Sequence, residues 1–177
     1  MNKRIFVLLG GSGTGKTSIG LYMRNELNIP EIVSHTTRAI RPGEVDGVTY
    51  YYVSEAEFET IEKIEEVVYS GNRYCISKEE IDRKLETSDK LFVICDKEGM
   101  LQLKKHYPDE VRVVYVYISL VEMAERMRKR GDNEDNIAKR LAFAHETGEL
   151  NNIEHADYVV INRNWEETKR LISCIVE

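Results

Sequence analysis

Short apolar runs alternate with amphipathic stretches along most of the chain. Four runs rich in Val, Ile, Phe and Tyr have the length of buried strands, and they lie at residues 4–9, 91–95, 112–118 and 158–161. Between them apolar residues recur at helical spacing, and we expect helices near residues 15–27, 55–62, 78–86, 97–106, 120–129, 134–148 and 165–175. Strands that alternate with helices favour a parallel sheet flanked by helices, so the pattern predicts an α/β fold.

Two segments depart from this alternation. Residues 34–76 contain short strand-like runs beside turns, such as Tyr50 to Val53, and they predict a small β-rich insertion. Residues 125–135 place four positive charges ahead of a polar turn. We therefore expect a single domain whose parts are a core at about 1–33, 87–124 and 149–177, an insertion at about 34–86 and a lid at about 125–148.

Three of the expected helices begin with the spacing of a capping box, in which a serine is followed three residues later by a glutamate. The pairs are Ser54 with Glu57, Ser77 with Glu80, and Ser119 with Glu122. Trp165, the single tryptophan, is expected to anchor the last helix in the core.

Composition excludes several classes of protein. A net charge of −6 over 177 residues argues against general affinity for nucleic acid. The three cysteines show no metal-ligand spacing, so reduced thiols and a cytoplasmic location are expected. The apolar run after Lys3 and Arg4 is too short for a signal peptide or a membrane span, so no membrane association is expected.

A glycine-rich loop that follows the first apolar run matches the phosphate-binding pattern G-x-x-x-x-G-K-[ST]. Bare backbone N–H groups at its glycines can wrap a polyphosphate, and the helix that follows points its positive end at the anion. In this pattern Lys16 serves the β- and γ-phosphates, and the Thr17 hydroxyl is a ligand for Mg²⁺. The expected ATP site consists of Gly10, Gly11, Ser12, Gly13, Thr14, Gly15, Lys16 and Thr17.

A second set of anion-binding side chains follows in residues 34–50. Arg38 and Arg41 can fork onto one phosphate, and Tyr50 can donate its hydroxyl to the same oxygens, which describes a monophosphate pocket. The alternative is that both arginines are solvated loop charges and that Tyr50 is a half-buried strand residue. The phosphate-binding loop upstream favours the pocket.

Residues 34–50 also meet every fixed position of the signature S-x-T-T-R-x-x-R-x-G-E-x-x-G-x-x-Y, and here the chain resembles the guanylate kinase family. This family has a P-loop kinase fold, and the resemblance implies phosphoryl transfer from ATP to GMP, and to dGMP, with Mg²⁺ as cofactor. The likeness covers nearly the whole chain, because further segments follow in the family's order: 70–74, 126–131, 137–141 and 160–162.

The resemblance assigns roles to individual side chains. Glu65 would read guanine by accepting from N1 and the 2-amino group, because a carboxylate suits an edge with two donors; Glu66 is the neighbouring alternative. Asp96 would help to read the base or would cap the helix that follows, and these two roles are compatible. The acceptor nucleotide would be held by Ser34, Arg38, Arg41, Glu44, Tyr50, Glu65, Tyr74 and Asp96.

The positive segment fits a lid over the donor. Arg126 and Arg130 lie four residues apart on one helix face, and Arg140 approaches them if the intervening turn folds back. With Lys16 they would be the catalytic cations; alternatively, they are a solvated helix end that suits the negative helix dipole. The resemblance places Asn162 near the donor adenine, although asparagine is also common in turns.

The chain departs from the family at two positions. Ile76 stands where the family has a hydroxyl residue facing guanine O6, and an unpaired polar edge costs about 1–3 kcal/mol, unless Ser77 takes over through a local shift. Ile94 replaces an acid that would orient the hydration shell of Mg²⁺, which leaves Thr17, the phosphates and water as ligands.

The leading interpretation is an ATP-dependent guanylate kinase with small-molecule substrates, acting as a monomer or a homodimer. One alternative is a kinase of the same fold for a ribose bisphosphate or a modified nucleotide, and Ile76 is the feature that favours it. Another is a non-catalytic guanylate kinase-like binding module, which the missing acid at Ile94 favours. The intact phosphate-binding loop argues against the module.

Overall fold

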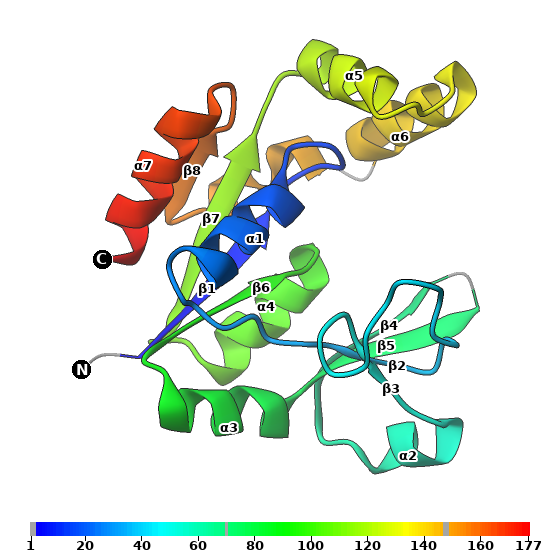
Figure 1. The fold of residues 1–177 in the computed structure, drawn as a ribbon, viewed down its shortest axis with the longest axis vertical. Coiled ribbons are helices and arrows are strands. Elements are labelled where there is room, and N and C mark those ends of the chain that lie inside the picture. The colour runs from blue at the N-terminus through cyan, green and yellow to red at the C-terminus, as the bar shows by residue number, and fades with distance from the viewer. Residues whose placement is uncertain (1–2, 70, 147–148) are drawn as a thin grey trace.

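A four-stranded parallel sheet forms the centre of the computed structural model, which describes residues 3–69, 71–146 and 149–177 (Figure 1). The strand order is β6-β1-β7-β8, and every neighbouring pair runs parallel. The four predicted runs match these strands to within one residue, which confirms the predicted sheet. The strands are β1 Arg4–Leu9, β6 Lys90–Ile94, β7 Val111–Tyr117 and β8 Tyr158–Ile161.

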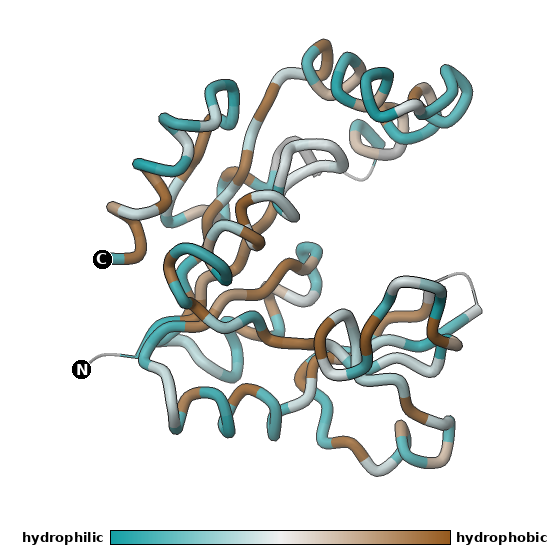
Figure 2. Tube along the Cα trace, viewed as in Figure 1, coloured by the Kyte–Doolittle hydropathy of each residue, from teal (hydrophilic) through white to brown (hydrophobic). Residues whose placement is uncertain are grey.

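Helices cover both faces of this sheet, which explains why its strands read as continuous apolar runs. Along β1, Phe6 and Leu8 belong to the buried cluster that includes α1 and α7, whereas Ile5 and Val7 belong to the cluster that includes α3 and α4. Figure 2 shows the resulting concentration of apolar residues along the central strands. The covering helices are α1 Lys16–Asn25, α3 Lys78–Thr87, α4 Lys97–His106 and α7 Trp165–Val176.

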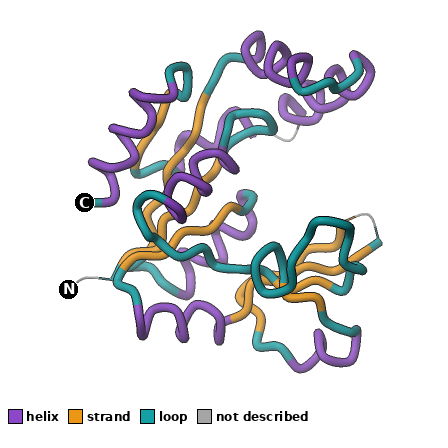
Figure 3. Tube along the Cα trace, in the orientation of Figure 1, coloured by secondary structure: helices purple, strands orange, loops and turns teal. Residues whose placement is uncertain are grey.

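A second, mixed sheet lies within the predicted insertion and stands beside the core (Figures 1 and 3). Its strand order is β3-β2-β5-β4, and the β4–β5 hairpin is antiparallel. Residues 30–32 lead into it along β6, where Ile32 N donates to Phe92 O at 2.8 Å. The elements are β2 His35–Thr36, β3 Tyr51–Tyr52, α2 Glu55–Thr60, β4 Lys63–Tyr69 and β5 Asn72–Ser77.

The predicted lid consists of two packed helices, α5 Leu120–Lys129 and α6 Glu134–Glu146. Met123, Met127 and Ile137 form a small apolar cluster of their own between these helices. The predicted end of the lid at 147–148 lies outside the described residues. A 3₁₀ helix at Glu149–His155 leads back to β8. No helix in the described ranges combines the length and the apolarity needed to cross a membrane.

Two local expectations are wrong. Ser77 accepts the Glu80 N–H as predicted, but the buried Glu80 carboxylate does not return to Ser77, because it accepts from Val33 N and pairs with Lys84. Trp165 is 39% exposed and meets Tyr22 edge-on at the surface. The buried face of α7 is formed by residues four apart, namely Thr168, Ile172 and Val176.

Candidate active site

The glycine-rich loop between β1 and α1 has a backbone that only glycine fits. Gly13 and Gly15 have φ angles of 82° and 101°, and a Cβ on Gly15 would lie 2.2 Å from Asn162 Nδ2. Gly15 is also the N-cap of α1, so no side chain caps the first backbone N–H groups of this helix. Because these N–H groups point out of the helix end, the loop forms an anion site.

Lys16 and Thr17 face a cavity of about 370 Å³ beside the loop. The Lys16 ammonium group donates to Gly10 O at 2.5 Å and to Gly11 O at 3.0 Å, so the lysine lies across the mouth of the loop. Thr17 is exposed at the start of α1, with its hydroxyl on the same helix end. Residues of the phosphate-binding motif therefore line this cavity.

The three predicted lid arginines converge on this loop. Arg126 and Arg130 line the same cavity as Lys16, as their spacing on one helix face predicts. Arg126 donates to Thr14 O at 3.4 Å, and Arg140 on α6 donates to Ser12 Oγ at 3.1 Å. The turn between α5 and α6 therefore does fold back, and it brings positive charge from two helices to the glycine-rich loop.

Asn162 is buried behind the loop, with 4% of its surface exposed. Its Nδ2 donates to Thr14 O at 2.7 Å, and its Oδ1 accepts from Thr168 Oγ1 at 2.9 Å. These bonds tie Asn162 to the backbone of the glycine-rich loop, and its place in an ATP site near adenine stays a prediction. Sequence reasoning missed Thr168, because nothing in a helical threonine shows that it fixes the orientation of an amide on another element.

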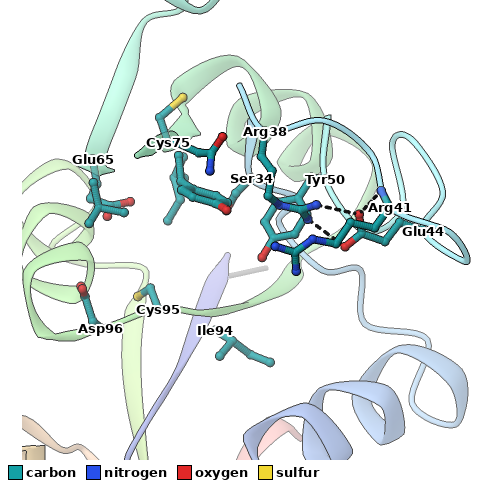
Figure 4. Close-up of a pocket in the computed structure, with 14 residues that line it drawn as sticks. Ser34, Arg38, Arg41, Glu44, Tyr50, Glu65, Cys75, Ile94, Cys95 and Asp96 are labelled. Carbon is teal, nitrogen blue, oxygen red and sulfur yellow. Dashed lines mark hydrogen bonds and ion pairs between the residues drawn. The ribbon is translucent and has the colours of Figure 1, made fainter. Parts of the chain in front are cut away.

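The predicted acceptor residues line a second cavity, of about 470 Å³, between the second sheet and the core (Figure 4). One end of this cavity is lined by arginine and tyrosine side chains. Arg38 is 8% exposed, and its guanidinium carbon lies 5.6 Å from the centroid of the Tyr50 ring. The rings of Tyr50 and Tyr74 meet edge-on. The eight predicted acceptor residues all line this cavity: Ser34, Arg38, Arg41, Glu44, Tyr50, Glu65, Tyr74 and Asp96.

Glu44 holds the guanidinium of Arg38 at this end. Its two oxygens accept from both terminal nitrogens of Arg38, at 2.8 and 3.0 Å, and Oε2 also accepts from Arg41 N and from the Tyr52 hydroxyl. The hydrogen bond from Arg38 lowers the pKa of Glu44 to about 2, so this carboxylate stays ionised and would repel a phosphate. Glu44 lines the cavity and holds Arg38, and its role toward the acceptor stays a prediction.

The other end of the cavity holds the carboxylates Glu65 and Asp96 (Figure 4). Glu65 lies on β4 opposite Ile76 on β5, whereas Arg73 binds Glu66 at 2.7 Å. This separation selects Glu65 over Glu66 as the residue that faces the cavity. Burial, then the charges of Asp96 and Glu66, raise the pKa of Glu65 to about 7.

Asp96 and Ile76 complete this end. Asp96 Oδ1 accepts from Gly99 N at 3.0 Å as the N-cap of α4, and the residue also lines the cavity, so both expected roles are compatible. Ile76 is 2% exposed and belongs to the main apolar cluster. Ser77 cannot replace the missing hydroxyl, because its side chain caps α3 and does not line the cavity.

A third hollow, of about 410 Å³, shares lining residues with both the cavity at the loop and the predicted acceptor cavity. Thr17 lines it on the donor side, and Ser34 and Tyr50 line it on the acceptor side. The glycine-rich loop thus stands next to the pocket that Arg38 and Arg41 line. Fold and site together define a phosphotransferase of the P-loop class.

Comparison with known proteins agrees with this class. The sequence model of the family described as guanylate kinase matches residues 2–177. A guanylate kinase of Haemophilus influenzae is 34% identical over 98% of this chain and 86% of its own length, and one of Thermus thermophilus is 34% identical over 94% and 77%. The crystal structure of a guanylate kinase from Anaplasma phagocytophilum aligns with a TM-score of 0.70 at 27% identity, covering 99% of this chain and 85% of that one. The chain belongs to the guanylate kinase family.

Proposed function

We propose that this protein transfers the γ-phosphoryl group of ATP to the phosphate of GMP, and of dGMP, giving ADP and the nucleoside diphosphate. The observation that carries this proposal is the hollow that joins Thr17 on the donor side to Ser34 and Tyr50 on the acceptor side. It leaves space for two phosphate groups to meet between the two anion sites. Family membership supports the same reaction.

The reaction needs no general base from the protein. A phosphomonoester loses its second proton with a pKa near 6, so the attacking oxygen of the acceptor is already ionised at neutral pH. The protein has to align two anions that repel each other and to place positive charge where the phosphoryl group is transferred. Lys16, Arg126, Arg130 and Arg140 are the cations placed for this task at the donor loop.

The acceptor is held at both of its ends. Arg38, Arg41, Tyr50, Tyr74 and Ser34 would bind the phosphate and sugar side, with Arg38 held in place by Glu44. The carboxylates of Glu65 and Asp96 would accept from the N1 and 2-amino donors of guanine. This distance between phosphate and base contacts favours a nucleotide over a ribose bisphosphate, which offers no base to Glu65.

The residues present fit Mg²⁺ as a cofactor held mainly by substrate. Thr17 offers its hydroxyl beside the loop, and the described residues contain no group of three acidic, histidine or cysteine side chains that would hold a metal. Magnesium commonly keeps several waters and binds through few protein ligands and substrate phosphates, so Thr17 alone is a sufficient protein ligand. When bound, Mg²⁺ would neutralise charge on the β- and γ-phosphates.

The α5–α6 pair would act as a lid. Its arginines already reach Thr14 and Ser12 of the loop, and closure over ATP would exclude water and so limit wasteful hydrolysis. We place the protein in the cytoplasm, in agreement with its three free cysteines. We propose that it acts there as a monomer or a homodimer.

Turnover and ligand stabilisation test the proposal. With ATP and Mg²⁺ present, GMP should release ADP in a coupled assay and should raise the melting temperature beyond the effect of ATP, because a ligand of the folded state stabilises it. A ribose bisphosphate that stabilises the protein when GMP does not would favour the kinase for another acceptor. A Lys16→Ala variant with unchanged ATP affinity would favour the binding module.

A further inference from the structure

The base end of the acceptor cavity offers hydrogen-bond acceptors and apolar groups. Figure 4 shows Glu65 and Asp96 there, with Cys95 beside Asp96 and Ile94 farther along the same cavity. Burial raises the pKa of the Cys95 thiol well above its usual range, so this group stays a thiol, which is a weak donor. A base with two donors on its edge therefore finds its partners at this end, whereas a base acceptor finds no strong donor among these four side chains once both carboxylates are ionised.

Electrostatics orient guanine within this end. Its edge presents the acceptor O6, the donor N1–H and the donor 2-amino group in that order. The carboxylates of Glu65 and Asp96 attract the two donors and repel O6. Glu65, Asp96 at the N-cap of α4, and Ile76 opposite Glu65 on β5 all line this cavity, so O6 would turn away from Asp96 and toward Ile76.

Ile76 cannot move aside to admit another partner. It is 2% exposed and packs in the same buried cluster as Ile64 and Ile81. Directly opposite residues of an antiparallel pair have their Cβ atoms about 4.5–5.5 Å apart, so a base edge that rests on Glu65 also touches Ile76. The C6 side of a base held by Glu65 would therefore meet the apolar side chain of Ile76.

We propose that Ile76 makes base selection rest on the N1 and 2-amino donors and not on the C6 substituent, so that guanine nucleotides with a weakly accepting C6 group are used as well as GMP. This inference rests on the proposed function. The step itself is unchanged: an acceptor phosphate oxygen bonds to the γ-phosphorus of ATP, the bond from that phosphorus to its bridging oxygen breaks, and ADP leaves with the electron pair.

A substrate panel on the unmodified protein tests this without any variant. 6-Thio-GMP keeps both donors and replaces O6 by sulfur, a weaker acceptor, whereas IMP keeps O6 and lacks the 2-amino donor. We expect kcat/KM for 6-thio-GMP to lie within about fivefold of that for GMP, and that for IMP to fall at least about tenfold below it. A loss of more than about fivefold with 6-thio-GMP would overturn the inference.

A matched pair of variants tests the residue. Ile76→Thr and Ile76→Val create side chains of the same shape that differ in one hydroxyl, so both leave the same void in the core. We expect Ile76→Thr to exceed Ile76→Val by about tenfold in kcat/KM for GMP, and the two to be alike with 6-thio-GMP. Equal activity of the two variants with GMP would contradict the role of Ile76.

Failure of this inference can be told apart from failure of the proposed function. If GMP is phosphorylated but 6-thio-GMP is strongly disfavoured, the function stands and the role of Ile76 falls. If the unmodified protein phosphorylates none of GMP, 6-thio-GMP and IMP, both fail. Folding of the variants is checked by their melting temperatures, and the panel on the unmodified protein decides the question if either variant does not fold.

Discussion

Glu65 and Ile76 lie directly opposite each other across the antiparallel β4–β5 pair, on the face that lines the acceptor cavity. One supplies a carboxylate and the other an apolar wall, so the pair treats the donors and the acceptor of a base edge differently. The next residue, Glu66, is held by Arg73 and pairs in register with Cys75. One position along β4 therefore separates the carboxylate that lines the cavity from the one that Arg73 holds.

Exchange of Glu65 for glutamine should remove most of the preference for guanine. The amide keeps the size of the side chain but offers one acceptor in place of two, so one donor of the base loses its partner. We expect kcat/KM for GMP to fall about hundredfold, with the KM for ATP unchanged. Glu66→Gln is the matched control, since Glu66 faces Arg73 on an exposed surface, and it should change kcat/KM less than about threefold. Equal losses in both variants would contradict the assignment.

The activity with GMP should depend on the ionisation of Glu65. Its pKa in the free protein is raised from 4.5 to about 7, and only the carboxylate accepts two hydrogen bonds. kcat/KM for GMP should therefore fall about tenfold per pH unit below about pH 7. The phosphate of GMP also titrates, near pH 6. The Glu65→Gln variant separates the two groups, because its profile should keep the step near pH 6 and lose the one near pH 7. An unchanged profile in the variant would exclude Glu65 as the titrating group.

The ion pair between Arg38 and Glu44 should matter for the acceptor and not for the donor. Glu44→Gln removes the charge that fixes both terminal nitrogens of Arg38, so the guanidinium loses its orientation toward the phosphate. We expect the KM for GMP to rise about tenfold, with the KM for ATP constant. Tyr52→Phe removes a single hydrogen bond to Glu44 and should raise the same KM by about twofold to threefold. The positioning role is wrong if the KM for ATP rises as much as the KM for GMP.

Thr168 and Asn162 are buried side chains that should affect the affinity for ATP through the hydrogen bond from Asn162 to the glycine-rich loop. The Thr168 hydroxyl fixes the orientation of the Asn162 amide, and this orientation points Nδ2 at Thr14 O. Thr168→Val keeps the shape and removes the hydroxyl, so we expect the KM for ATP to rise about tenfold while the KM for GMP stays constant. Thr168→Ser restores the hydroxyl and should recover the affinity for ATP. Equal effects on both substrates, or no recovery with serine, would indicate a general packing defect.

The sequence predicts the parts of this protein that depend on local pattern. The strands of the main sheet follow from apolar runs that are buried on both faces, and the phosphate-binding loop follows from glycine spacing. The choice of Glu65 over Glu66 rested on the family resemblance and not on the local pattern, because a register shift between Lys63 and Glu65 affects which of them faces the cavity. A bulge has no reliable signal in the amino-acid sequence.

Contacts between distant elements were also beyond prediction. Glu80 has the spacing of a capping box, yet a buried position beside Val33 and Lys84 gives its carboxylate other partners. Trp165 has the size of a core residue but begins α7 at the surface, where it is 39% exposed. The positioning roles of Glu44 and Thr168 likewise arise only when Arg38 and Asn162 are brought to them.

The most direct test of the central claim is steady-state ADP release with ATP and Mg²⁺ across GMP, dGMP, AMP, CMP and UMP, with Lys16→Ala as the inactive control. The arrangement of the donor loop, the arginine pocket and Glu65 predicts a kcat/KM for GMP at least about hundredfold above that for AMP, CMP or UMP, and turnover of dGMP as well. Absence of ADP release with GMP, or equal use of GMP and AMP, would contradict it.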